Sequence, residues 1–400
     1  MPELPTLRSA SARRFDAVLV ARGLTGRVVE LPESTRTAAE AAKAVGCELR
    51  QIVKSLVFRG RDSGNPVLIL VSGANRVDEP WMAGYLGEHL ERAHPEFARS
   101  ATGYAIGGVP PAGHVAPIPT YIDYDLLELR EVWAAAGHPN AVCRLTSGEL
   151  LDLTHGRPVP VTPTAGADGG ADRPWFTFDC YGTLVDWKEG FLTAVRNIGV
   201  AESRPEGERL FHEYLAAEPT VESGPYRPYR EVMAETLVRA VRANGGHLAT
   251  ERAEELSDSV PEWPLFPDVA EALAGLKSRG LRLGILSNID REMLRRTLAH
   301  HGIPADFVVT AEDVHSYKPA PPHWIRFLKE NRTRPGEVTH VSSSCEYDLA
   351  TAGALGFRTV HVARYGPLPA GGKVDGAVSS LPALLDLRTG STGPPSPTPS

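Results

Sequence analysis

The 400-residue sequence lacks the features that mark membrane, secreted and nucleic-acid-coating proteins. No apolar run approaches the roughly 18 residues that cross a bilayer, and the start, Met1–Thr6, has neither the basic nor the apolar region of a signal peptide. The four cysteines form no CxxC pair, which is typical of buried small residues in a reducing compartment. A net charge of −7 argues against a surface that coats nucleic acid, although it permits a local phosphate-reading patch. We therefore expect a cytoplasmic protein that binds neither membrane nor DNA.

The chain is long enough for two domains, and its composition indicates where they meet. Proline, glycine and alanine dominate the stretch before residue 174, which predicts a linker over 161–174. The last dozen residues, 389–400, are typical of a disordered tail. The sequence thus predicts a first domain over 1–160 and a second over 175–388.

Four polar features follow strand-like stretches of the second domain, in an order that suits one catalytic site: an aspartate, a serine–asparagine pair, a lysine and a second aspartate. Asp179 follows an apolar stretch, where a carboxylate at a strand end can attack an electrophile in an open crevice. Ser287 and Asn288 follow the next such run, Lys318 comes later, and Asp348 closes the set. A nucleophile, a small polar pair, a lysine and a distal acid are therefore available for one catalytic site.

Residues 174–385 resemble the haloacid dehalogenase superfamily, and within it the type II 2-haloacid dehalogenases. The resemblance is carried by the motifs Phe178–Trp187, Leu286–Asp290 and Ser316–His323. It implies a doubly wound, Rossmann-like α/β core with a helical cap at about 188–262. It also implies a small organic acid as substrate and no cofactor.

The same resemblance assigns roles to the catalytic residues. Asp179 would be the nucleophile that forms an ester intermediate, and Lys318 would keep it ionised and oriented by charge pairing. Ser287 and Asn288 would hold the substrate carboxylate or the attacked group, with Asp348 as the distal acid.

The residue two positions after the nucleophile separates dehalogenases from the phosphatases of this superfamily. Phosphatases carry an aspartate there as general acid, whereas this chain has Tyr181, and a phenol with a pKa near ~10 is a poor proton donor at neutral pH. A halide needs no proton to leave. A magnesium-dependent phosphatase remains the alternative, with Asp179 and Asp348 as metal ligands. The magnesium site would be weakened because Ser343 or Ser344 stands where another carboxylate is common.

Two departures from the dehalogenase pattern weaken the analogy. Cys345 stands where the pattern has an asparagine, so the hydrolytic water would lose an amide partner. The substrate-side arginine of the family has no secure counterpart. Arg227 and Arg230 are candidates that would either read a carboxylate bidentately or lie on the surface. The predicted substrate-binding residues are Tyr181, Arg227, Arg230, Ser343 and Ser344.

The first domain is predicted to be a mixed α+β fold, because helices and strands alternate without a regular βαβ rhythm. Expected helices cover residues 6–23, 37–45, 79–94 and 147–154. Expected strands cover residues 52–58, 66–71, 119–122 and 141–145.

Residues 10–160 resemble the YbaK/ProX family of aminoacyl-tRNA editing domains. The matching pieces are Gln51–Phe58, Ser72–Asp78, Thr102–Pro111 and Val132–Val142. The resemblance implies that Lys54 binds the end of an aminoacyl-tRNA and that the glycine-rich loop stabilises an oxyanion through its N–H groups. The editing site would then comprise Lys54, Gly107, Gly108, Pro110, His138 and Asn140.

Each of these first-domain features also has a plain structural interpretation. Lys54 could be a solvent-facing strand residue, the glycine-rich loop a simple turn, and His138 a turn residue rather than a base. Our main hypothesis is a bifunctional hydrolase that deacylates mischarged aminoacyl-tRNA and hydrolyses a haloacid. Besides the phosphatase, the alternative is a first domain that only binds tRNA or protein, fused to a degenerate second domain.

Overall fold

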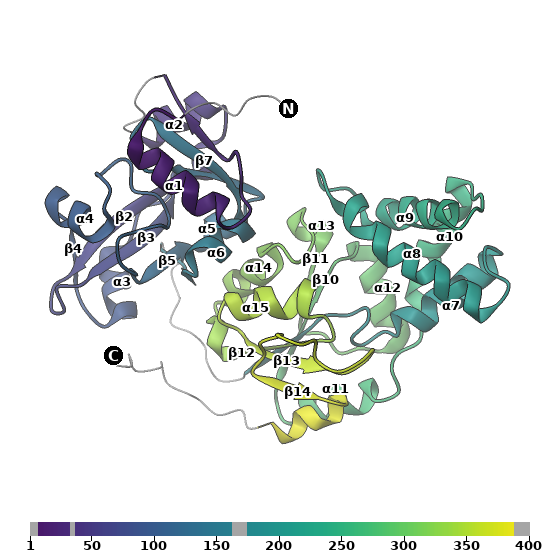
Figure 1. Cartoon of the computed structure of the whole chain (residues 1–400). Coiled ribbons are helices and arrows are strands. Elements are labelled where there is room, and N and C mark those ends of the chain that lie inside the picture. The colour runs from purple at the N-terminus through teal and green to yellow at the C-terminus, as the bar shows by residue number, and fades with distance from the viewer. Residues whose placement is uncertain (1–6, 33–36, 162–173, 388–400) are drawn as a thin grey trace. The chain divides into compact units, whose positions relative to one another are not determined.

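The computed structural model describes residues 7–32, 37–161 and 174–387 and divides the chain into two compact units, the first made mainly of residues up to 161 and the second mainly of residues from 174 on (Figure 1). The predicted tail at 389–400 lies outside the described residues, as does almost all of the predicted linker at 161–174. No helix within the described ranges combines the length and apolarity needed to cross a membrane.

The first unit is built on a mixed eight-stranded sheet, which agrees with the expected α+β class. Its long central hairpin pairs β2 and β3 in antiparallel register, and β6 joins β2 in parallel. The strand order is β1 (Val28–Glu30), β7 (Ala141–Thr146), β6 (Glu131–Ala135), β2 (Ile52–Gly60), β3 (Pro66–Ser72), β5 (Thr120–Asp123) and β8 (Arg157–Val159), with β4 (Leu90–Arg92) paired to β2.

Six helices accompany this sheet, and local capping explains where several begin. Thr37 and Thr146 each form a capping box with the glutamate three residues later, which satisfies free N–H groups of the first turn. The helices are α1 (Ala10–Val20), α2 (Ala38–Val45), α3 (Glu79–Leu86), α4 (Pro95–Thr102), α5 (Tyr124–Leu127) and α6 (Ser147–Thr154).

The predicted helix over 79–94 is wrong in its second half. Helix α3 ends at Leu86 because Gly87 takes a left-handed conformation with φ of 79°, which ends a helix at low cost. The chain then returns as β4, whose residues pair with the far end of β2. Strands β1, β6 and β8 and helices α4 and α5 were not predicted either.

The second unit contains a six-stranded sheet in which all strands are parallel, as expected for a doubly wound core. Every residue of the central strand β9 is buried, since helices cover both faces of such a sheet. The strand order is β11 (Phe307–Thr310), β10 (Arg282–Ser287), β9 (Trp175–Phe178), β12 (Val338–Ser342), β13 (Arg358–Val362) and β14 (Gly376–Val378).

A helical cap is inserted between β9 and the first core helix, close to the expected position (Figure 1). The start of α9 is held by the loop after β10, because Asp290 accepts hydrogen bonds from the backbone of Tyr229 and Arg230 at 2.8 and 2.9 Å. The cap consists of α7 (Trp187–Ile198), α8 (Arg204–Glu222), α9 (Tyr229–Ala243) and α10 (Thr250–Ser259). The helices that connect the strands are α11 (Val269–Ser278), α12 (Arg291–His301), α13 (Ala311–Val314), α14 (Pro322–Asn331) and α15 (Ala350–Ala354).

The strand order indicates where a ligand site of the second unit lies. The chain runs from β9 outward to β10 and β11, then returns to the other side of β9 as β12. In such sheets the crevice for ligands lies at the carboxyl ends of the strands, where the order reverses. Asp179 sits at this switch point, and its backbone N–H donates to the carbonyl of Val341 in β12 at 3.1 Å.

Candidate active site

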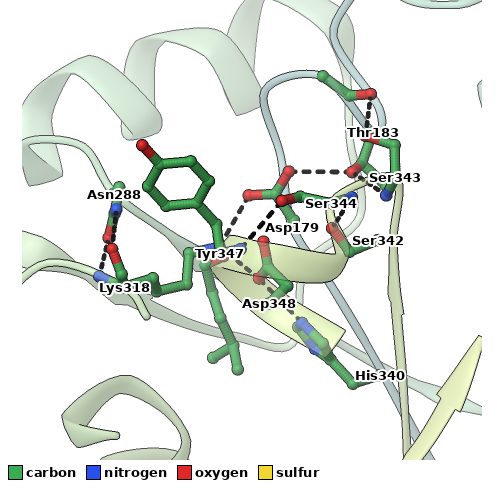
Figure 2. Close-up of polar contacts among 12 residues, drawn as sticks. Asp179, Thr183, Asn288, Lys318, His340, Ser342, Ser343, Ser344, Tyr347 and Asp348 are labelled. Atoms are coloured by element: carbon green, nitrogen blue, oxygen red, sulfur yellow. Dashed lines mark hydrogen bonds and ion pairs between the residues drawn. The ribbon is translucent and has the colours of Figure 1, made fainter. Parts of the chain in front are cut away.

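Lys318 is the centre of the polar cluster at this edge (Figure 2). Its ammonium donates to Asp179 Oδ1 at 2.8 Å, to Asp348 Oδ1 at 2.6 Å and to the carbonyl of Leu286 at 2.9 Å. The lysine side chain is 2% exposed, and three partners match the three N–H donors of an ammonium. The structure therefore brings together three of the residues predicted from the sequence and fixes the orientation of the Asp179 carboxylate, the predicted nucleophile.

The other oxygen of Asp179 is held by the turn that follows it. Thr183 Oγ1 donates to Asp179 Oδ2 at 2.9 Å, and the backbone N–H of Ser343 donates to Thr183 Oγ1 at 3.1 Å. The turn reverses at Gly182, whose φ of 90° favours glycine. Ser343 Oγ donates to the Gly182 carbonyl at 2.8 Å, so Ser343 anchors the turn that carries the nucleophile.

The pKa values of the two carboxyls that contact Lys318 shift in opposite directions. Burial raises the pKa of Asp179, and the opposing charge of Lys318 does not fully offset that effect. Burial also acts on Asp348, but Lys318 and a hydrogen bond from His340 outweigh it and lower the pKa of Asp348 to about 2. The pKa of Lys318 is raised, because Asp179 and Asp348 outweigh its own burial. Asp348 is thus the permanent counter-ion, and Asp179 is the more basic of the two carboxylates.

His340 is a positioning residue that the sequence analysis missed. It lies fully buried in the middle of β12, with Nε2 3.0 Å from Asp348 Oδ1 and Nδ1 2.9 Å from Thr177 Oγ1. His340 and Thr177 are register partners on β12 and β9, so the sheet itself aligns this chain of contacts. The only signal in the sequence was a single histidine within an apolar strand.

The side chain of Asn288 holds the backbone of Lys318. The Asn288 side chain donates to the Lys318 carbonyl at 3.1 Å and accepts from the Lys318 N–H at 2.6 Å. The neighbouring Ser287 is 1% exposed. These contacts fix the loop that presents the lysine, while the role of Ser287 and Asn288 in holding substrate stays a prediction.

Tyr181 and Ser344, two further predicted substrate-binding residues, also have partners within the protein. The Tyr181 hydroxyl lies 2.7 Å from Thr297 Oγ1, and burial raises the pKa of this phenol well above its usual range. Ser344 caps a π-helical turn, Cys345–Leu349, by accepting from the N–H of Tyr347 at 3.0 Å. This turn carries Asp348, so Ser344 and Cys345 lie at the base of the acid.

The two candidate arginines pair with acids of the cap. Arg227 Nη1 lies 2.8 Å from Glu235 Oε2, and Arg230 Nη2 lies 3.6 Å from Asp258 Oδ1. No contact found among the described residues joins either guanidinium to Asp179. Their role in binding a substrate carboxylate stays a prediction.

The carboxylates at this edge fit a magnesium ion poorly. The Oδ1 atoms of Asp179 and Asp348 both face the ammonium of Lys318, and Asp179 Oδ2 accepts from Thr183. Within the ranges that the structure describes, no group of three or more acidic, histidine or cysteine side chains is arranged to hold a metal. A magnesium ion would have to share these carboxylates with the ammonium of Lys318.

In the first unit, Lys54 has defined partners and is not a freely solvated strand residue. Its ammonium donates to the carbonyl of Gly73 at 3.2 Å and to that of Asn75. The Asn75 side chain in turn donates to Asp123 Oδ2 at 2.8 Å. Burial lowers the pKa of Lys54, although the nearby Asp123 opposes that effect. Among the described residues, the ammonium therefore keeps one N–H donor beyond these two carbonyls.

The glycine-rich loop approaches the turn that carries His138. A Cβ on Gly108 would lie 2.9 Å from the His138 backbone, so this position needs glycine. The Gly108 N–H donates to the Ala105 carbonyl at 2.9 Å, which leaves Gly107 as the better candidate for an oxyanion donor. His138 Nδ1 accepts from the N–H of Asn140 at 3.2 Å, as expected of a turn residue.

A pocket of about 150 Å³ lies between this loop and the sheet. Strand β2 provides one wall directly after Lys54, and Ile106 and Val109 of the loop provide another. The predicted Pro110 follows, and its carbonyl lies 2.9 Å from His114 Nε2. The remaining lining is Ser55, Leu56, Val57, Phe58, Arg92 and Ala93.

Comparison with known proteins identifies both units. Residues 32–153 match the model of the aminoacyl-tRNA editing domain, and residues 175–356 match that of haloacid dehalogenase-like hydrolases. The (S)-2-haloacid dehalogenase 4A of Burkholderia cepacia is 32% identical over 48% of this chain and 84% of its own length. The uncharacterised protein YwhH of Bacillus subtilis is 32% identical over 32% of this chain and 80% of its own. A solved structure described as a proposed trans-editing enzyme for prolyl tRNA synthetase is 52% identical over 40% of this chain and all of its own, with a TM-score of 0.38.

The chain therefore belongs to the haloacid dehalogenase-like hydrolases through its second domain, and its first domain is an aminoacyl-tRNA editing domain. Both resemblances inferred from the sequence motifs are confirmed.

Proposed function

We propose that the second domain hydrolyses an organic halide through an ester formed on Asp179. The observation that carries this proposal is the clamp of Lys318 on Asp179, combined with Tyr181 at the position of the missing acid. The partly buried phenol of Tyr181 has a raised pKa and a partner in Thr297, so it is poorly suited to protonate a leaving oxygen. A halide leaves without a proton, which suits this arrangement.

The reaction has two steps. An oxygen of Asp179 attacks the carbon that bears the halogen, and the carbon–halogen bond breaks as the halide leaves with the electron pair. Water then adds to the ester carbonyl of Asp179, and the alcohol product departs as the carboxylate re-forms and one proton goes to solvent. One oxygen of the carboxylate is thereby replaced by an oxygen from water.

For the first domain we propose hydrolysis of the ester bond in mischarged aminoacyl-tRNA. Lys54 is available to pair with phosphate at the tRNA end, since a lysine acts as a point charge for phosphate. The pocket beside it would take the amino-acid side chain, and the Gly107 N–H would stabilise the oxyanion formed when water attacks. Aminoacyl-tRNA as a partner also implies a cytoplasmic location.

A single-turnover experiment in ¹⁸O-labelled water tests the second-domain chemistry. With enzyme in excess over a halogenated substrate, mass spectrometry of the peptide that contains Asp179 should show one ¹⁸O, and halide should be released. Release of phosphate from simple esters only when magnesium is added would favour the phosphatase instead. Absence of turnover on halides, phosphate esters and mischarged tRNAs would favour the degenerate alternative.

A further inference from the structure

Arg364 follows β13 and reaches the turn that comes after Asp179. Its Nε donates to the carbonyl of Thr183 at 2.9 Å. Its terminal nitrogens face the Asp268 carboxylate, with Nη1 donating to Oδ2 at 3.0 Å and Nη2 lying 2.8 Å from Oδ1. The guanidinium carbon lies 4.2 Å from the centroid of the Phe266 ring, and the Arg364 side chain is 6% exposed. These partners compensate the burial of a charge and hold the arginine in one position.

The support on which Arg364 rests belongs to the body of the second unit. Asp268 directly precedes helix α11, and its Oδ2 also accepts from the backbone N–H of Leu381 at 2.9 Å. The neighbouring Phe266 donates its backbone N–H to the carbonyl of Leu184, in the same turn as Thr183, at 3.0 Å. Arg364 therefore joins this turn to a support outside the strand that carries Asp179.

Thr183 connects Arg364 to the reacting carboxylate. The Thr183 carbonyl accepts from Arg364, and the Thr183 side chain donates to Asp179 Oδ2 at 2.9 Å. Tyr365, the next residue after Arg364, lies against the same turn, because its Cε2 would be 3.7 Å from a Cβ placed on Gly182. Two consecutive residues after β13 thus contact the turn that orients Asp179.

The rate of attack depends on where this turn lies. An oxygen of Asp179 must line up with the bond that breaks, and a misplacement of about 1 Å can cost about 10²-fold in rate. The three guanidinium nitrogens of Arg364 all have partners in the protein. Arg364 can therefore act on the reaction through Thr183 without touching a substrate.

We propose that Arg364 is a positioning residue, which holds the Thr183 carbonyl and so fixes the orientation from which Asp179 attacks. This inference rests on the dehalogenase function proposed above. It adds to that function a residue that the sequence analysis did not select.

Halide release from 2-chloropropionate by the full-length protein tests this role. Arg364→Gln should lower kcat about 30-fold and change KM less than about threefold, because the turn shifts while no group that contacts substrate is removed. Arg364→Lys keeps the charge but not the forked geometry, and its kcat should exceed that of Arg364→Gln by about fivefold.

Arg282→Gln is the matched control. The guanidinium carbon of Arg282 lies 3.8 Å from the centroid of the Trp175 ring, but Arg282 is the first residue of β10 and lies at the opposite end of this strand from the catalytic edge. The control loses a similar ring contact and should keep kcat within about twofold of the wild type. Melting curves show which variants fold. If Arg364→Gln does not fold, Asp268→Asn weakens the support of the arginine and should lower kcat about fivefold at constant KM.

Chemical labelling of Asp179 separates this inference from the proposed reaction. The same proteins are treated with a water-soluble carbodiimide and glycine ethyl ester, and the labelled peptides are quantified by mass spectrometry. Labelling of Asp179 should rise about threefold in Arg364→Gln and stay unchanged in Arg282→Gln, since a carboxylate released from its support is more accessible. That result supports the positioning role even if the wild type releases no halide, in which case the proposed reaction alone fails. A folded Arg364→Gln variant with wild-type kcat and labelling, or an equal fall of kcat in Arg282→Gln, would overturn the inference while leaving the reaction intact.

Discussion

Replacing Lys318 with methionine should destabilise the second domain, and more strongly at pH 8 than at pH 5. Methionine keeps the length of the side chain but removes all three hydrogen bonds, and it leaves Asp179 and Asp348 buried without a counter-charge. Breaking a buried pair in this way costs about 3–5 kcal/mol. For a domain of this size, that corresponds to a fall in Tm of roughly 6–20 °C.

The sign of the pH dependence follows from the pKa values. In the wild type, the pKa of Asp348 is lowered to about 2, so the stabilisation from Asp348 is present above pH ~4 and is lost as the pH falls towards 2. Over about two pH units this amounts to about 2 kcal/mol. Without Lys318, both buried carboxyls should have raised pKa values. The variant then binds protons on folding, and its stability should rise as the pH falls from 8 to 5.

Differential scanning calorimetry of the full chain at pH 5 and pH 8 measures this effect, with the transition of the first domain as an internal reference. Lys277→Met is the matched control, because Lys277 pairs with Asp306 at 2.7 Å on the surface, where both side chains are about one-third exposed. It should cost less than about 1 kcal/mol and show little pH dependence. If Lys318→Met lost no more stability than this control, or lost the same amount at both pH values, the charge-clamp interpretation would be refuted.

Three further predictions concern single side chains. Asp179→Asn should reduce halide release at least 10³-fold with little change in Tm, because an amide is not a competent nucleophile; most of the activity persisting without deamidation would exclude Asp179 as the nucleophile. Lys54→Ala should lower deacylation of mischarged tRNA roughly 10–100-fold, since a charge-assisted contact is worth about 1.5–3 kcal/mol, whereas the exposed Lys43→Ala should not; equal rates for Lys54→Ala and wild type would place the tRNA end elsewhere. His340→Gln should raise the pKa of Asp348 and move acid unfolding of the second domain to higher pH, and an unchanged acid transition would show that His340 does not stabilise this carboxylate.

The order of the motifs correctly predicted which polar residues lie together, because parallel strands place the segments that follow them at one edge of the sheet. Because β9, β10, β11 and β12 run parallel, their carboxyl ends meet at one edge, and the segments that carry Asp179, Lys318 and Asp348 follow these ends. Local sequence signals also predicted helix ends correctly where a single residue sets the backbone conformation. The capping box at Thr146 and the histidine at its far end, for example, bound α6 at Ser147–Thr154, as predicted.

The prediction of a helix over 79–94 was wrong because the local signal at Gly87 is ambiguous. Gly87 can end a helix or sit within one, and only pairing of the following residues with β2 decides that the chain leaves the helix there.

The sequence by itself therefore determined the two families and their folds, and it gave the order of the polar residues that meet at the carboxyl edge of the second sheet. Tertiary structure alone decided which polar side chains face one another. The register of β12 on β9 places His340 beside Thr177, and the other ring nitrogen of His340 contacts Asp348. The sequence of an apolar strand does not reveal its register. The cap acid Glu218 is an ordinary helix residue in the sequence. Folding buries it against the Tyr229 hydroxyl, where lost hydration raises its pKa to about 7.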